Sequence, residues 1–161
     1  MWALVTLFTT LIGRAIVRLA PVILVALLSA AQTGPVADDF SVTLERVGCL
    51  GSCPDYKVTI LANGSVEYEG RAYVRIEGTR RSTIPASTVQ TLVKKLRDED
   101  FSHWEEKKQV CLDFPEVHIT VMMNGRRKHV LEGCNSPGKV LALADEIDKI
   151  SGTKHWVGRV R

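Results

Sequence analysis

The chain has 161 residues, and its 21 lysine and arginine residues against 18 aspartate and glutamate residues give a formal charge of +3. Of the first 31 residues 23 are apolar, and setting them aside leaves 19 basic against 18 acidic residues, or +1. A remainder of that length forms one domain with a real core, so these totals exclude a multidomain enzyme and a polybasic nucleic-acid binder.

Residues 1–31 have the order of a secretory signal peptide. Two arginines precede an uninterrupted apolar run over residues 19–28, which is shorter than the roughly 20 residues of a bilayer span. Small residues occupy positions 29–31, so we predict cleavage near Ala31 and an exported protein. The alternative is that the segment stays uncut as an N-terminal anchor, which would be the chain's contact with a membrane. Residues 32–39 follow as a linker without an apolar period.

The stretch from Phe40 to Ile84 alternates apolar and polar side chains with the period of two that half-buried strands show. Asn63-Gly64 between two such runs predicts a tight hairpin, because both residues tolerate positive φ. Gly70 predicts a bulge or bend. We therefore expect strands over residues 40–45, 56–60, 66–69, 72–76 and 80–84.

A helix is predicted after Pro85. Its apolar residues are spaced i, i+3, i+4 and i+7, and Ser87-x-x-Gln90 has the pattern of a capping box at its start. Phe101 and Trp104 are expected to close its end against the sheet. The apolar stripe consists of Val89, Leu92, Val93 and Leu96.

A second hairpin repeats the pattern of the first. Residues 117–121 and 128–131 alternate on either side of an Asn-Gly turn at residues 124–125. With a two-residue turn, facing residues have numbers that sum to 249, so Cys134 stands opposite Pro115.

The last helix is predicted to begin with Ser136 as its cap and Pro137 in its first turn, and to end at Gly152. The order is then strands, helix, hairpin, helix. We therefore expect an α+β domain with an antiparallel sheet of about six strands and two helices packed on one face. This domain occupies residues 40–157, and residues 158–161 form a tail.

Four cysteines follow the leader, at positions Cys49, Cys53, Cys111 and Cys134. In an oxidising compartment an even count predicts two disulfides, with three connectivities open. Because the hairpin register places Cys134 within a few residues of Cys111, we predict that these two are bonded. Elimination then pairs Cys49 with Cys53.

The Cys-x-x-x-Cys-Pro-x-Tyr element at Cys49–Tyr56 resembles a bacterial exported family known as domain of unknown function 6438. The likeness covers most of residues 40–157. It implies a periplasmic or secreted bacterial protein, or one held at the inner membrane by its leader, and it implies no activity. The residues that carry it are Cys49, Cys53, Pro54, Tyr56, Gly64, Gly70, Asp113, Pro115, Gly125, Asp148 and Trp156.

Several side chains have a structural and a functional interpretation. Asp113 precedes a strand, where a carboxylate accepts backbone N–H bonds and fixes a turn, but Glu116 close by leaves a ligand or catalytic carboxylate pair open. Tyr56 and Tyr68 fall on the apolar phase of the first hairpin, so we expect core positions with the hydroxyls at the rim. Trp156 is expected to pack the chain's end onto the sheet.

The chain's cationic residues gather in two places. Arg126, Arg127 and Lys128 form a basic tip after the second turn, which is typical of solvated edge charge or, alternatively, of contacts with an anionic partner. A second basic cluster is formed by Arg71, Arg75, Arg80 and Arg81.

Metal and cofactor motifs are not found in the sequence. The four histidines, His103, His118, His129 and His155, form no i, i+4 pair, and the cysteine spacing is wrong for zinc knuckles, so we expect no metal and no cofactor.

No nucleotide-binding loop, nucleophile elbow or metalloprotease motif occurs in the sequence. We therefore expect a non-enzymatic binding module of the cell envelope, which meets an unknown protein or envelope component, not nucleic acid, through its open sheet face or the loop at residues 49–56. The alternatives are a thiol-disulfide redox protein that uses Cys49 and Cys53, and a hydrolase with a dispersed site.

Overall fold

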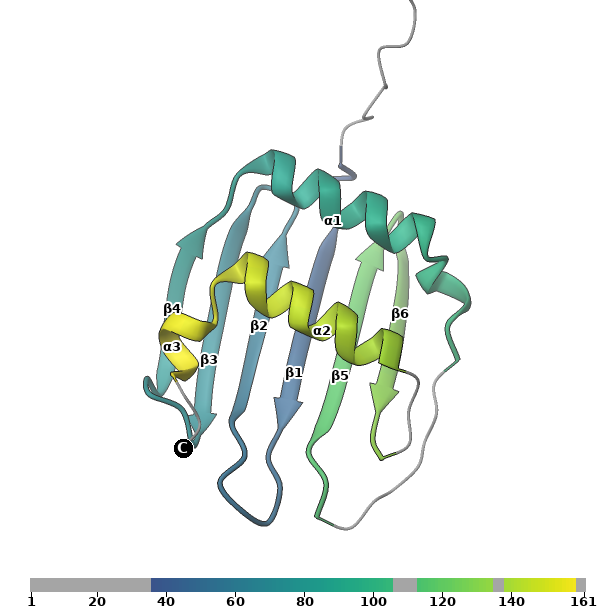
Figure 1. Cartoon of the computed structure of the whole chain (residues 1–161). Coiled ribbons are helices and arrows are strands. Elements are labelled where there is room, and N and C mark those ends of the chain that lie inside the picture. Colours follow the sequence, from purple (N-terminus) through teal and green to yellow (C-terminus); the bar gives the residue numbers. More distant parts are fainter. Residues whose placement is uncertain (1–35, 106–112, 135–137, 159–161) are drawn as a thin grey trace, which may run out of the picture. The chain divides into compact units, whose positions relative to one another are not determined.

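Alternating apolar residues build one antiparallel sheet of six strands in the order β4-β3-β2-β1-β5-β6 (Figure 1). The computed structural model describes residues 36–105, 113–134 and 138–158, all within one unit, Gly34–Arg161. The expected sheet of about six strands is confirmed. The strands are β1 (Ser41–Val47), β2 (Asp55–Leu61), β3 (Ser65–Ala72), β4 (Gly78–Thr83), β5 (Glu116–Met123) and β6 (Arg126–Glu132).

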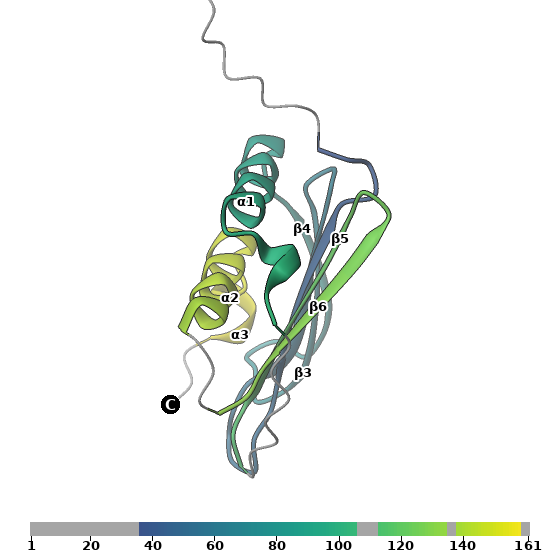
Figure 2. The ribbon, with the colours of Figure 1, turned by 90° about the vertical axis from the view of Figure 1, so that its right-hand side faces the viewer.

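The helices cover one face of this sheet and leave the other face open (Figure 2). Helix α1 (Ala86–Asp98) buries the predicted stripe, and α2 (Gly138–Ser151) crosses the same face. A 3-10 turn at Phe101–His103 places Phe101 and Trp104 in the core, as expected. The predicted α+β architecture is confirmed, and a short helix, α3 (Lys154–Val157), is an addition that the sequence pattern does not predict.

The strand register gathers three loops at one end of the sheet. Val117 faces Glu132, a sum of 249, so the predicted register of the second hairpin is confirmed. Strand β1 pairs with β2 on one side and with β5 on the other. The β5–β6 hairpin therefore lies next to the first strand of the sheet. The loops at residues 48–54 and 113–115 therefore lie at the same end as the end of β6.

The predicted strand over residues 72–76 is wrong. Strand β3 ends at Ala72 and β4 begins at Gly78, with a bend between them in which Tyr73 has a φ of 53°. In this bend the backbone N–H groups do not pair with a neighbouring strand. They donate to carbonyl groups near the C-terminus, and Ile76 N donates to Trp156 O at 2.9 Å. The bulge expected at Gly70 is confirmed by a register shift, with Tyr56 facing Gly70 and Asp55 facing Ala72.

The predicted capping box of α1 is also wrong. The N-cap residue is Pro85, and no side chain caps this end. Ser87 lies inside the first turn, where its carbonyl oxygen accepts a hydrogen bond from Thr91 Oγ1 at 2.9 Å. The helix begins two residues earlier than the box requires because proline already has a helix-compatible φ.

Several predictions fall outside the described residues: the leader at 1–31, Cys111, the Ser136 and Pro137 cap, and the end of the tail. Within the described ranges no helix combines the length and apolarity that a membrane crossing needs. The last linker residues belong to the domain, because Asp39 accepts N–H bonds from Asn124 and Gly125 in the β5–β6 turn.

Candidate functional site

A cavity of about 650 Å³ opens at the end of the sheet where β1 and β6 end and β2 and β5 begin. Helices α2 and α3 contribute to the wall opposite the sheet. A volume of this size suits a small ligand or a few side chains of a larger partner. Part of the predicted motif comes together here, since the cavity is lined by Cys53, Pro54, Tyr56, Pro115 and Asp148.

Apolar side chains that are exposed to solvent line the mouth of the cavity. Phe114 and Leu141 line it and are 58% and 43% exposed. Leu50 is 88% exposed, and its N–H donates to Asp113 Oδ1 at 2.9 Å, next to Phe114 in the chain. We call Leu50, Phe114 and Leu141 the apolar rim. Large exposed apolar residues gathered around a cavity are typical of a contact surface.

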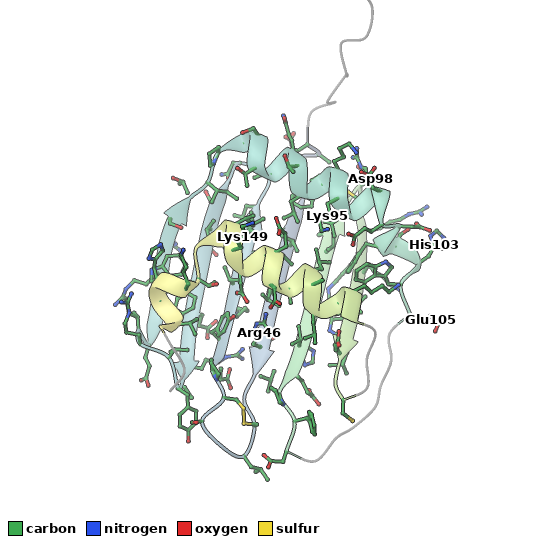
Figure 3. The ribbon with its side chains drawn as sticks, viewed as in Figure 1. Arg46, Lys95, Asp98, His103, Glu105 and Lys149 are labelled. Atoms are coloured by element: carbon green, nitrogen blue, oxygen red, sulfur yellow. A yellow bond between two sulfur atoms is a disulfide. The ribbon has the colours of Figure 1, made fainter. Side chains whose placement is uncertain are left out.

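Asp148 of α2 joins three elements at the back of the cavity. Its carboxylate accepts the Tyr56 hydroxyl at 2.8 Å, Arg46 Nε at 2.9 Å and Thr153 Oγ1 at 2.7 Å. Arg46 also donates to Asp145 Oδ1 at 2.8 Å, and it lies beside α2 on the covered face of the sheet (Figure 3). The network therefore pins β1 and β2 to α2, and it is charge-assisted throughout.

The protonation states in this network are fixed. Burial, reinforced by the negative charge of Asp148, holds the pKa of the Tyr56 hydroxyl well above its usual range. Burial is the largest influence on the pKa of Arg46 and lowers it, but the charges of Asp148 and Tyr56 and the hydrogen bonds to Asp148 and Asp145 together outweigh it, so the pKa is raised. Both side chains stay protonated donors near neutral pH, so they hold structure or bind acceptors and do not act as general bases.

Glu132 brings a carboxyl group with an open hydrogen-bonding site into the cavity. Its residue is 3% exposed and lines the cavity from the end of β6. Burial raises the pKa of this carboxyl group. A hydrogen bond from the Leu141 backbone lowers it by less, so the pKa is raised overall. Its Oε2 atom has no hydrogen-bond partner. Leaving a buried carboxyl oxygen unsatisfied costs free energy, so a ligand that donates a hydrogen bond there would gain affinity.

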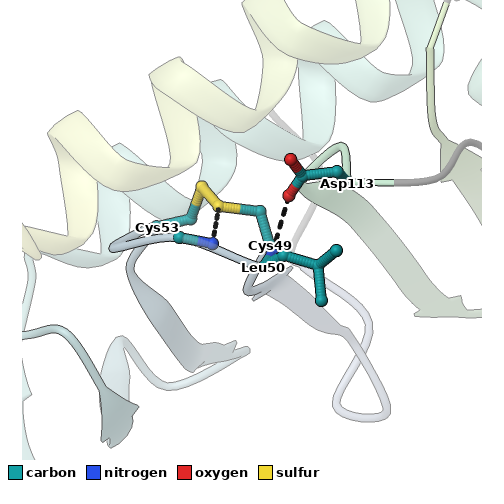
Figure 4. The surroundings of a disulfide bond; sticks show 5 residues. Cys49, Leu50, Cys53 and Asp113 are labelled. Atoms are coloured by element: carbon teal, nitrogen blue, oxygen red, sulfur yellow. Dashed lines mark hydrogen bonds between the residues drawn. A yellow bond between two sulfur atoms is a disulfide. The ribbon is translucent and has the colours of Figure 1, made fainter.

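The Cys49–Cys53 disulfide shapes the loop at the cavity's edge (Figure 4). The bonded sulfurs close a five-residue turn between β1 and β2, as predicted. Asp113 fixes this loop from the β5 side through its bond to Leu50 N. The expected role of Asp113 in accepting a backbone N–H is confirmed, although the N–H comes from a distant loop and not from its own turn.

The other predicted pairings have mixed outcomes. Cys134 lines the cavity and is disulfide-bonded, whereas Cys111 lies outside the described residues, so the Cys111–Cys134 bond stays a prediction. Glu116 Oε2 accepts His118 Nε2–H at 3.1 Å, so the structure gives this carboxylate a histidine partner. The hypothesis of a catalytic pair with Asp113 has no contact to support it among the described residues.

The remaining motif residues have packing roles. A Cβ atom at Gly64 would stand 2.3 Å from Ile84 O, and one at Gly70 would stand 2.2 Å from Ile76 O, so neither position accepts a side chain. Gly125 takes a φ of 69° in the second hairpin turn. Trp156 packs on Tyr68 with ring centroids 4.9 Å apart, which confirms its predicted role. Tyr68 is a core residue and its hydroxyl donates to Ile76 O.

The two basic clusters lie away from this cavity. Arg126, Arg127 and Lys128 belong to β6, at the turn end that is opposite the cavity. The second cluster is divided among ion pairs, since Arg71 contacts Glu45 and Asp55, and Arg81 contacts Glu67. The anionic-partner contact predicted for the basic tip stays a prediction.

The fold and the site together define a small α+β domain with a ligand-sized cavity. A family model, described as domain of unknown function 6438, matches residues 40–151, from the residue before β1 to the end of α2. The chain belongs to this family, and the predicted membership is confirmed. No curated protein matches the chain. Its function therefore has to be argued from the cavity.

The sequence pattern did not identify several of the cavity's main residues. Arg46, Glu132 and Asp145 sit in strands or a helix among ordinary surface charges. One signal was available, because Arg46 and Glu132 occupy inward positions of their strands, where Val42 and Val130 are buried. A charged residue at an inward strand position indicates a buried partner or a site.

Proposed function

We propose that this chain is an exported, non-enzymatic binding module whose partner docks on the apolar rim and inserts a side chain into the cavity. The observation that carries the proposal is the combination of the exposed apolar rim with the buried, unpartnered Oε2 of Glu132, a residue that lines the same cavity. A small molecule that filled only the cavity would leave Leu50, at 88% exposed, in water. A protein partner can cover the rim and fill the cavity together.

The charges of the cavity indicate the chemistry of the inserted group. Among the described lining residues Arg46 is the one cation, against four carboxyl groups. Arg46 is already engaged by Asp145 and Asp148, while the side chain of Asp145 is 75% exposed. A lysine or arginine flanked by apolar residues therefore complements this surface, because it gives Glu132 a donor and the rim apolar contacts. The four carboxyl groups belong to Glu116, Glu132, Asp145 and Asp148, of which that of Glu116 is bonded to His118 on the open face of the sheet, so Glu132, Asp145 and Asp148 are the ones that face a ligand.

The lining argues against catalysis in the cavity. Its described residues include no serine, threonine, lysine or histidine, and both of its cysteines are disulfide-bonded. Asp148 is saturated by three donors, and Tyr56 stays protonated. Among the described lining residues, therefore, no free nucleophile with a base beside it occurs, and the carboxyl groups of Glu132 and Asp145 are the acid–base groups that remain.

Selection from a displayed library of random peptides tests the proposal. We expect enriched peptides to carry lysine or arginine beside apolar residues, and fluorescence anisotropy to show at least tenfold weaker binding to Phe114→Ser and to Glu132→Gln. Tyr73→Ser is the matched control, because Tyr73 is 61% exposed but lies in the β3–β4 bend outside the cavity. Enrichment of acidic peptides, or equal binding to all three variants, would refute the proposal.

Export is supported by the leader pattern and by the disulfides. Intact-mass analysis of the chain purified from its host tests it together with the disulfide pairing. We expect the mass of a chain cleaved near Ala31 and lacking four hydrogens. A full-length chain with free thiols would place the protein in a reducing compartment.

A thiol-disulfide redox protein is the second candidate, and one contact favours it. Gly51 N–H points at Cys49 Sγ at 3.4 Å, a position from which it would stabilise a thiolate. Insulin reduction that is lost in Cys49→Ser would establish this activity. No turnover, with a reduction potential below about −300 mV, would identify a structural bond.

A further inference from the structure

Two histidines face each other on the open side of the sheet, away from the cavity. His118 of β5 faces Leu131, and His129 of β6 faces Thr120, so the two side chains are diagonal neighbours across the strands. Both alternate with inward residues, since Ile119 and Val130 are buried in the core. The register therefore places both imidazoles on the face that the helices leave open.

The two rings meet through single nitrogen atoms. His118 Nδ1 and His129 Nε2 are 3.3 Å apart, and the ring centroids are 5.4 Å apart. The centroids are separated by the nitrogen–nitrogen distance plus about two ring radii, so both nitrogens lie between the rings and face one another. The side chain of His118 is 24% exposed, which leaves the pair accessible to an ion.

Glu116 fixes the tautomer that metal binding needs. His118 Nε2–H donates to Glu116 Oε2 at 3.1 Å, so in the neutral ring Nδ1 carries the lone pair. Histidines that bind metals commonly donate their other N–H to a carboxylate in this way. The lone pair of His118 Nδ1 then points toward His129 Nε2.

We propose that His118 Nδ1 and His129 Nε2 together bind one divalent transition-metal ion, Zn²⁺ or Cu²⁺, on the open face of the sheet. Two imidazole nitrogens on one tetrahedral Zn²⁺, each at about 2.0–2.1 Å, stand about 3.3 Å apart, and the observed separation is 3.3 Å. The ion would lie beside the line that joins the two nitrogens, so both rings turn from their hydrogen-bonded orientation when it binds. Binding moves the proton of His129 from Nε2 to Nδ1, so that both rings stay neutral and both facing nitrogens offer lone pairs, and it transfers no electrons. This site is separate from the proposed function and does not depend on it.

Two protein ligands leave the remaining coordination positions to water. The described part of the chain holds no group of three or more histidine, cysteine, aspartate or glutamate side chains arranged for a metal. The ion is therefore expected to exchange readily, and Cu²⁺ to bind more tightly than Zn²⁺ because imidazole sites follow that order. The expectation of no metal rests on the helical spacing of histidines and on the spacing of cysteines, and neither pattern detects a diagonal pair across two strands.

Calorimetric titration of the tag-free, oxidised chain with ZnCl₂ tests the site. We expect one ion per chain, at least tenfold weaker binding in His118→Asn and in His129→Asn, and loss of binding in the double variant. Glu116→Gln, which keeps both ligands, is expected to bind about 10-fold more weakly. The matched controls are His103→Asn and His155→Asn, which change the other two histidines of the chain.

Thermal unfolding separates metal binding from folding. Zn²⁺ should raise the melting temperature of the wild-type chain and of both controls, and should leave the double variant unchanged. The four single variants should melt alike without metal, because none of the four histidines belongs to the buried core. Equal Zn²⁺ affinity in the double variant and in the wild type would overturn the proposal. So would the absence of binding at about 1 mM Zn²⁺, a concentration that detects even weak binding.

Discussion

An arginine lies between two carboxylates on each face of the sheet, Arg46 of β1 on the covered face and Arg71 of β3 on the open face, and the two clusters differ in their surroundings. On the covered face Arg46 contacts Asp145 at 2.8 Å and Asp148 at 2.9 Å. On the open face Arg71 contacts Glu45 at 2.6 Å and Asp55 at 2.7 Å. The clusters even share neighbours, since Glu45 precedes Arg46 in β1.

The difference lies in burial and in additional donors. Side-chain exposure is 21% for Arg46 and 19% for Asp148, against 36% for Arg71, 32% for Glu45 and 25% for Asp55. Asp148 also accepts hydrogen bonds from Tyr56 and Thr153, whereas the open cluster consists of ion pairs alone in the contacts described. The two clusters have the same kinds of charged groups but should contribute differently to the free energy of unfolding. Water solvates the charges that remain when an exposed ion pair is broken, but it does not reach them when the pair is covered.

Removing the acceptor of the covered cluster gives the largest expected effect. Asp148→Ala leaves the Tyr56 hydroxyl without its partner and Arg46 with the exposed Asp145 alone, so we expect a loss of about 3 kcal/mol in the free energy of unfolding. Urea unfolding followed by tryptophan fluorescence measures it. Asp145→Ala is the control, since that side chain is 75% exposed, and equal losses in the two variants would show that burial is irrelevant here.

Tyr56→Phe removes one donor from the same carboxylate and keeps the ring packing. A hydrogen bond to a charged group is lost, so we expect destabilisation of about 2 kcal/mol at pH 7. Tyr68→Phe should cost about 1 kcal/mol, because its hydroxyl donates to a neutral carbonyl, Ile76 O. The reverse order would show that Asp148 is satisfied without Tyr56.

The raised pKa of Tyr56 also predicts the alkaline limb of stability. The folded pKa lies above the unfolded one, so the contribution of Tyr56 is fully present below about pH 10, the ordinary tyrosine pKa, and is lost as the pH rises further. The stability of Tyr56→Phe should consequently approach that of the wild type only in strong alkali. A gap that closes between pH 6 and 9 would contradict this assignment.

Glu132→Gln tests the effect of a carboxyl group that lies on the covered face without a cationic partner. Its pKa is raised in the folded chain, so its ionisation destabilises the fold as the pH rises above its ordinary value. We expect the variant to be more stable than the wild type by about 1 kcal/mol at pH 8, and to lose this advantage near pH 4. Unfolding curves at several pH values measure the difference, and a constant gap would exclude ionisation of Glu132 as its cause.

Local sequence patterns predicted the strands and helices well, because each pattern depends on the residues of one helix, strand or turn. Each of the six strands overlaps a predicted one, and the Asn-Gly turns set both hairpins, with Val117 facing Glu132 as expected. The bend after Ala72 was missed because its N–H groups are satisfied by Trp156, which lies 80 residues further along the chain. Periodicity contains no information about such a partner.

The candidate site was only partly predictable for the same reason. Tyr56 and Asp148 were identified within a motif, but their contact joins residues 92 positions apart. Arg46 and Glu132 looked like ordinary strand charges until packing placed them on the covered face. His118 and His129 were dismissed because helical spacing was the test applied, and a hairpin register was needed to bring them together.

Arg71→Ala should give the smallest effect. Exposed ion pairs contribute little, so we expect a loss of about 0.5 kcal/mol in low salt, although Arg71 contacts two carboxylates at short distances. In 1 M NaCl the loss should vanish, since screening at that ionic strength acts over about 3 Å. The loss caused by Asp148→Ala should persist there, because its main cost is an unsatisfied covered donor and not a long-range attraction. If salt removed both effects equally, the covered cluster would be solvated like the open one, and burial would not distinguish the two faces of the sheet.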